Sequence, residues 1–195
     1  MSFKTFTAGE VLTATDVNTM LMTQALIRCT SGTRPSSPAE GWHIYETDTD
    51  KVYIYDGAAW AETLKIGTPT SFTPTWTTTG TAPAIGNGTL EGSYFRVGRM
   101  ITYSIALTAG STTTFGTGGW QFDYPVNAAG TLLMVGSALA FDTSGGTTTP
   151  GACRVSTSTI ILTFFGTGVV TNANPFTWAT GDILRLTISY QATSA

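Results

Sequence analysis

The sequence predicts a mainly β protein, in which a small N-terminal helix and a β-meander precede a C-terminal β-sandwich of the jelly-roll type. Apolar residues alternate with Thr and Ser through much of the chain after residue 65, which is the pattern of half-buried strands. The connecting segments are rich in Thr and Gly, and the 22 glycines suit turns between short strands. Helical spacing of apolar residues is convincing only near the N-terminus.

Charge divides the chain into two regions, residues 1–65 and residues 66–195. The first region holds 13 of the 21 charged side chains, and the second holds 8, four acidic and four basic. Charged residues make up 11% of the whole chain, against a usual share of roughly 25%. A neutral surface of hydroxyl groups favours association with copies of the same chain or with a neutral partner. We therefore expect an N-terminal attachment and oligomerisation region, followed by a β-sandwich domain.

The helix is expected over residues 13–28, with a threonine as its N-cap. Four side chains fall on one face at steps of three and four residues, namely Val17, Met20, Leu21 and Gln24. This stripe either packs on its own domain or contacts the same helix in other copies, with Gln24 near the axis fixing the register. On the second interpretation the four residues form an oligomerisation site.

Residues 42–60 are expected to form a hairpin that extends into a three-stranded meander. Trp42, Ile44, Val52 and Ile54 alternate with His43 and three tyrosines, and residues 46–50 form a polar link. The acidic residues of this link suggest a calcium loop, but Lys51 and Gly57 occupy the positions where an EF-hand needs Gly and Glu. A solvated turn is the better interpretation.

Alternating strands are expected throughout residues 66–195. The clearest candidates are residues 92–97, 101–107, 120–124, 132–141, 152–156, 159–165 and 184–190. Seven to nine short strands in about 130 residues favour a sandwich or jelly roll.

Composition argues against several classes of function. The 9 basic residues are scattered, and the net charge of −3 argues against a nucleic-acid surface. The single histidine, His43, alternates with bulky strand residues, and no nucleophile elbow or phosphate-binding loop is present. We expect no enzyme activity, no metal site and no cofactor. No apolar run is long enough for a membrane helix or a signal peptide, so we expect synthesis in the cytosol and no membrane partner.

Trp76 and Trp178 are candidates for contact with a glycan, because each is flanked by Thr and an exposed indole can stack on a sugar ring. Trp120 alternates with Phe122 and is expected in the core.

Two stretches resemble tailed-bacteriophage virion surface proteins of the minor tail, short fibre or capsid decoration type. The first comprises FTAGEVLTATDVNTMLMTQALI over residues 6–27 and TRPSSPAEGWHIYETDTDKVYIYDGAAW over residues 33–60. The second is GTLEGSYFRVGRMITYSIALTAGSTTTFGTGGWQFDYPV over residues 88–126, which is similar to the C-terminal β-sandwich of many such proteins.

The resemblance implies a homotrimeric, non-enzymatic virion protein. Its N-terminal region would attach to tail or capsid proteins, and its sandwich would form an exposed knob that contacts a host cell-surface glycan, as in a receptor-binding minor tail protein. A capsid decoration or head-fibre protein is the alternative within this group. A carbohydrate-binding module is a second alternative, which would require neither the helix nor self-association.

Overall fold

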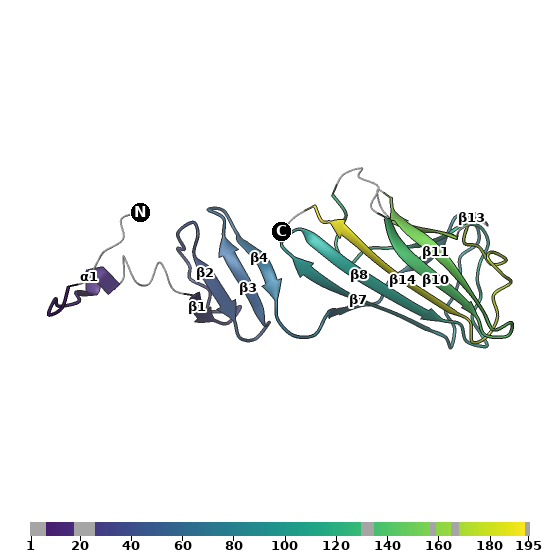
Figure 1. The fold of residues 1–195 in the computed structure, drawn as a ribbon, viewed down its shortest axis with the longest axis horizontal. Coiled ribbons are helices and arrows are strands. Elements are labelled where there is room, and N and C mark those ends of the chain that lie inside the picture. Colours follow the sequence, from purple (N-terminus) through teal and green to yellow (C-terminus); the bar gives the residue numbers. More distant parts are fainter. Residues whose placement is uncertain (1–6, 18–25, 130–134, 157–158, 165–167, 194–195) are drawn as a thin grey trace. The chain divides into compact units, whose positions relative to one another are not determined.

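The computed structural model describes residues 7–17, 26–129, 135–156, 159–164 and 168–193, and it confirms a mainly β fold (Figure 1). The chain divides into two compact units, Met1–Gly67 and Thr68–Ala195. Among the described residues the only helix is α1, Ala14–Asp16. The two units are described separately below.

The N-terminal helix begins where the sequence predicts and ends before the predicted boundary. Thr13 caps α1 through a capping box, because its Oγ1 accepts from the Asp16 N–H at 3.1 Å and its own N–H donates to Asp16 at 3.2 Å. The prediction of a helix reaching residue 28 is wrong, since Leu26–Cys29 forms strand β1. Strand β1 pairs in parallel with β2, so its residues are extended and not helical. Residues 18–25 lie outside the described part.

The N-terminal unit contains a four-stranded sheet in the order β1-β2-β3-β4. The predicted meander is formed by β2, His43–Glu46, β3, Lys51–Tyr55, and β4, Trp60–Lys65, which pair antiparallel. Ile44 and Tyr53 face each other across β2 and β3 and are buried. They are the two buried apolar side chains among the described residues of this unit, so its sheet has a small core of its own.

The C-terminal unit is built on a single large sheet. Its strands are β5 Thr70–Phe72, β6 Trp76–Thr78, β7 Thr89–Val97, β8 Met100–Thr108, β9 Trp120–Phe122, β10 Val135–Asp142, β11 Thr147–Val155, β12 Ile160–Phe164, β13 Gly168–Val169 and β14 Ile183–Gln191. The order is β5-β7-β8-β14-β10-β11-β12-β9-β6, with β13 paired to β12. Figure 1 shows β7, β8, β14, β10 and β11 side by side.

The two ends of this sheet are consecutive in the chain. Strand β5 is at one edge and β6 at the other, and only residues 73–75 join them. Four Cα steps span at most about 14 Å, so the sheet must curl until its edges approach each other. The two layers of the predicted sandwich are therefore parts of one continuous hydrogen-bonded sheet.

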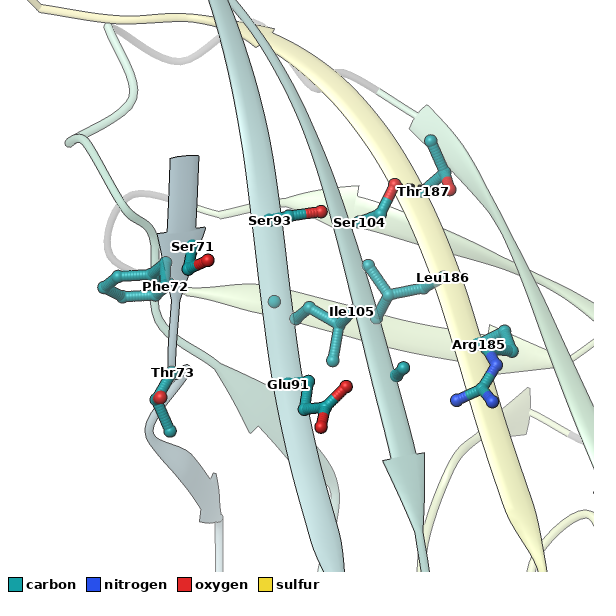
Figure 2. Close-up of a pocket in the computed structure, with 12 residues that line it drawn as sticks. Ser71, Phe72, Thr73, Glu91, Ser93, Ser104, Ile105, Arg185, Leu186 and Thr187 are labelled. Carbon is teal, nitrogen blue, oxygen red and sulfur yellow. Dashed lines mark hydrogen bonds between the residues drawn. The ribbon is translucent and has the colours of Figure 1, made fainter. Parts of the chain in front are cut away.

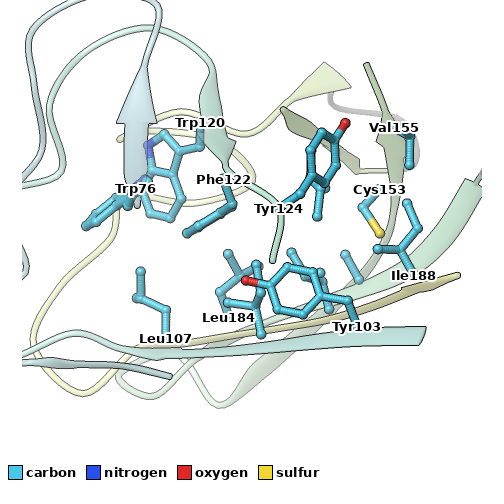
Figure 3. Close-up of a cluster of buried hydrophobic side chains, with 14 of the residues drawn as sticks. Trp76, Tyr103, Leu107, Trp120, Phe122, Tyr124, Cys153, Val155, Leu184 and Ile188 are labelled. Carbon is cyan, nitrogen blue, oxygen red and sulfur yellow. The ribbon is translucent and has the colours of Figure 1, made fainter. Parts of the chain in front are cut away.

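The core of the C-terminal unit lies inside this curl. Figure 3 shows Trp76, Trp120 and Phe122 on one side of the cluster, with Leu107 and Leu184 on the other. The ring centroids of Trp76 and Trp120 are 4.6 Å apart, in an edge-to-face arrangement that aromatic pairs favour. Side chains from β6 and β9 thus close over those of β8 and β14.

Two Thr- and Gly-rich connections, residues 79–88 and 110–119, are held together by hydrogen bonds. Ala84 and Thr114 exchange both backbone bonds at 2.8 Å. The Thr81 N–H donates to the Thr117 hydroxyl at 2.9 Å, and the Asn87 N–H donates to the Thr112 hydroxyl at 2.8 Å. Threonine side chains therefore continue the ladder where the strands end.

Candidate functional site

The predicted oligomerisation residues lie at the edge of the described part of the chain. Val17 follows α1 and is half-buried. Met20, Leu21 and Gln24 lie outside the described residues. The self-contact of this segment stays a prediction.

The two tryptophans predicted to contact a glycan lie in the core. Trp76 is 8% exposed and Trp178 is 4% exposed. Each packs against Trp120, with ring centroids 4.6 and 4.7 Å away. Stacking on a sugar requires an exposed ring face, and neither indole offers one in this structure. Flanking threonines do not indicate exposure here, because Trp76 lies in the three-residue strand β6 and Trp178 lies in the connection before β14, and neither segment is long enough in strand to show which residues point inward.

The acidic turn between β2 and β3 directs its carboxylates to separate partners. Glu46 is fully buried and forms an ion pair with Arg34, and it accepts from the Thr49 hydroxyl at 2.7 Å. Asp48 accepts from the Ser31 hydroxyl at 2.6 Å, a bond that lowers the pKa of Asp48. These contacts anchor the 30–34 segment to the hairpin. Within the described residues, no group of three or more His, Cys, Asp and Glu side chains is arranged to hold a metal ion.

The outer face of the large sheet is the most distinctive surface of the C-terminal unit. We define it as the odd-numbered residues of β7, β10 and β14 and the even-numbered residues of β8, whose neighbours in each strand point into the core. Hydroxyl residues occupy one transverse row of this face, where Ser93, Ser104, Thr187 and Ser137 are successive register partners. Ser71 on β5 extends the same row.

The next row carries the charge of the outer face. Glu91, Ala106, Arg185 and Leu139 are successive register partners on β7, β8, β14 and β10. Figure 2 shows Glu91 and Arg185 on either side of β8. Among the ion pairs of the described residues, neither charge has a partner. No sequence motif marks Glu91 or Arg185, although the alternation of their strands places both on the solvent side.

The centre of the outer face is hollowed because its side chains are small. Ser93, Ser104 and Ala106 have short side chains, and Figure 2 shows Glu91 and Arg185 beside Ser93 and Ser104. The hollow encloses about 530 Å³ and opens to solvent. Its lining residues include several hydroxyl groups and two opposite charges.

A membrane-spanning helix is absent from the part of the chain that the structure describes.

The chain is similar in part to a phage tail fiber protein. It is 31% identical over 110 residues to a protein of Haemophilus influenzae described as a Mu-like prophage FluMu defective tail fiber protein. The aligned part covers 55% of this chain and 18% of that protein, so the chain spans less than a fifth of its relative. No family model matches the chain. No solved structure matches it either. The similarity supports a general relation to phage tail proteins.

Proposed function

We propose that this protein is a structural component of a bacteriophage tail that assembles as a homotrimer. The observation that carries the proposal is the similarity to the tail fiber protein. In this proposal the N-terminal unit binds other virion proteins, and the C-terminal unit forms an exposed knob of the minor tail, receptor-binding type. No catalytic step is assigned to it.

The division into two units supports this arrangement. The N-terminal sheet buries few apolar side chains of its own, and both of its edge strands carry exposed leucines, Leu26 on β1 and Leu64 on β4. An open edge with apolar side chains is suited to a partner strand or surface. The C-terminal unit has a complete core and can present its surface independently of that attachment.

Immunogold labelling of particles from the phage that encodes the chain tests the location. Antibodies raised against the purified chain are expected to label the tail, and mass spectrometry of separated tails is expected to recover it. Label on the head would favour a capsid decoration or head-fibre protein and contradict the tail assignment. Absence of the chain from purified particles would contradict a virion role altogether.

The oligomeric state is tested independently by light scattering. A homotrimer has three times the chain mass of 20.5 kDa, and a monodisperse monomer at micromolar concentration would contradict it and favour a carbohydrate-binding module. If the N-terminal segment contributes to assembly, Leu21→Asp is expected to dissociate the oligomer or prevent incorporation into particles while the C-terminal unit stays folded. Normal assembly of this variant would exclude the N-terminal self-contact.

The absence of catalysis is also testable. Incubation of the protein with host surface polysaccharide is expected to release no new reducing ends. Release of reducing ends would show a depolymerase, and a pair of carboxylates would then have to be sought.

A further inference from the structure

We propose that the outer face of β7, β8, β14 and β10 is the contact surface between copies of the C-terminal unit, and that Glu91 of one copy pairs with Arg185 of the next. The inference rests on the proposed homotrimer and specifies which surface holds it together. It follows from the placement of charge, apolar side chains and hydroxyl groups on this face.

The two charged residues of the outer face have opposite signs, so the face of one copy is complementary in charge to the same face of another copy. Glu91 and Arg185 flank Ala106 in one register row, two strand spacings apart, so they lie at the same level along the strands. Rotation about an axis parallel to the strands keeps that level unchanged. It therefore brings the β7 side of one copy, with its carboxylate, against the β14 side of the next, with its guanidinium. Closed rotational symmetry then repeats the same ion pair in every copy.

Exposed apolar side chains of the C-terminal unit are concentrated on the same face. Six large apolar residues are exposed in the described part of this unit, and five of them are on the outer face: Phe95, Val97, Met100, Val135 and Leu139. Val97 and Met100 are register partners, and Phe95 is two residues from Val97, so three of the five are adjacent. Clustered exposed apolar groups mark an interaction surface.

Four hydroxyl groups on β8 and β14 of the outer face are already paired within one copy. The Thr102 and Ser189 hydroxyls are hydrogen-bonded to each other at 2.9 Å, and those of Ser104 and Thr187 at 3.0 Å. Because these pairs are already formed within one copy, covering them with a neighbour does not break a bond to protein. The small residues between them also allow a second backbone to approach closely.

The size of the face is sufficient for a specific contact. Strands β7, β8 and β14 have nine residues each, and together with β10 they span a patch of roughly 20 by 30 Å. The projected area is roughly 600 Å², which is the lower end of the size range of specific interfaces per partner. A single sugar would cover only the hollow and would leave the apolar side chains near Val97 and Met100 exposed.

Reversing the charge of Glu91 or Arg185 tests the proposed ion pair between copies. Glu91→Arg places two cations against each other in every contact, and Arg185→Glu places two anions. Each variant is expected to raise the concentration of half-dissociation on the order of 100-fold, because like charges that face each other repel strongly. The double variant Glu91→Arg/Arg185→Glu restores opposite charges and is expected to return to within about threefold of the wild type. Glu40→Arg, the same change at an exposed position of the N-terminal unit, is the matched control.

Sedimentation equilibrium over a concentration series measures these differences, and tryptophan fluorescence verifies that each variant is folded. If the single variants associate like the wild type, or if the double variant does not recover, the proposed contact is wrong while the trimer and the tail location stand. A monomeric wild type would overturn both the contact and the trimer, but not the tail location. A monomer whose Glu91 and Arg185 NMR signals shift on adding a hexose would identify the hollow as a sugar site and likewise overturn the contact.

Discussion

At the scale of single residues, two tyrosines of the same core differ in what their hydroxyls contact. The Tyr103 hydroxyl is buried and has no hydrogen-bond partner among the described residues. The Tyr124 hydroxyl donates to the carbonyl oxygen of Ser156 at 2.6 Å and accepts from the N–H of the same residue at 3.1 Å. Tyr103→Phe is therefore expected to be neutral or to stabilise by up to about 1 kcal/mol, and Tyr124→Phe to destabilise by about 1–3 kcal/mol. Urea denaturation at neutral pH measures both, and equal losses would contradict the assignment.

A second residue-scale prediction concerns the buried carboxylate of Glu46. Its ion pair with Arg34 also places the guanidinium 4.4 Å from the centroid of the Tyr53 ring. Arg34→Leu leaves the carboxylate buried without its partner and is expected to cost roughly 3 kcal/mol, limited by the partial exposure of Arg34. Hydrogen exchange of the β2–β3 amides measures the loss. Arg28→Leu, at an exposed position of β1, is the control, and equal effects of the two variants would refute a special role for Arg34.

The sequence contained part of this information at the residue scale. The prediction of a solvated turn over residues 46–50 was wrong for Glu46, which is the last residue of β2 and is buried. Its position two residues from Ile44 could have placed it on the buried side by alternation. Its partner Arg34 could not be predicted, because it comes from a Pro-rich connection with no periodicity. Trp76 was predicted to be exposed, and that prediction was wrong because β6 has only three residues and the burial of Trp76 depends on the curl of the whole sheet.

At the scale of secondary-structure elements, β10 depends on Gly136, where the backbone lies close against both neighbouring strands. A Cβ at Gly136 would be 2.2 Å from the carbonyl oxygen of Thr187 and 2.8 Å from Sγ of Cys153. Gly136→Ala must therefore displace β14 or β11 and is expected to destabilise the C-terminal unit by about 3 kcal/mol. Thermal unfolding measures this change. The control is Gly32→Ala, where a Cβ meets nothing within 4 Å, and it is expected to be near neutral. A neutral Gly136→Ala would contradict the prediction, because it would show that β10 and its neighbours shift to make room for the methyl group without loss of stability.

Long strands in which apolar and polar residues alternate were predictable from the sequence, and strands of three residues were not. The nine-residue strands β8 and β14 enclose the stretches expected from alternating Ile, Leu, Tyr, Thr and Ser. Strands β5 and β6 have three residues each, too few to show a period of two. Strand β1 was missed because its parallel partner β2 begins only after a long turn-rich connection. The pairing register of β7, β8 and β14 also determines the candidate site, because it places Glu91 and Arg185 in the same transverse row of the outer face.

At the scale of the whole molecule, the buried phenols and thiol of the C-terminal core make its stability sensitive to alkaline pH. Burial raises the pKa of Tyr103 and Tyr190, raises the pKa of Tyr124 to about 12, and raises the pKa of Cys153 to about 11. In the unfolded chain a phenol has a pKa of about 10 and a thiol about 8.5. The folded state therefore keeps protons that the unfolded state loses, and the free energy of unfolding falls as pH rises above these unfolded values.

The expected loss begins near the thiol pKa and steepens above about pH 10, where each buried phenol contributes about 1.4 kcal/mol per pH unit until its folded pKa is reached. Below about pH 8 these four groups contribute no pH dependence. Urea denaturation between pH 7 and 11, followed by tryptophan fluorescence, measures the slope. Tyr103→Phe removes one of the phenols, so its slope above pH 10 is expected to be shallower by one proton, and it gains stability relative to the wild type as pH rises. A free energy of unfolding that stays constant from pH 9 to 11 would mean that these groups reach solvent in the folded state, which is incompatible with a core closed by the curl of a single sheet.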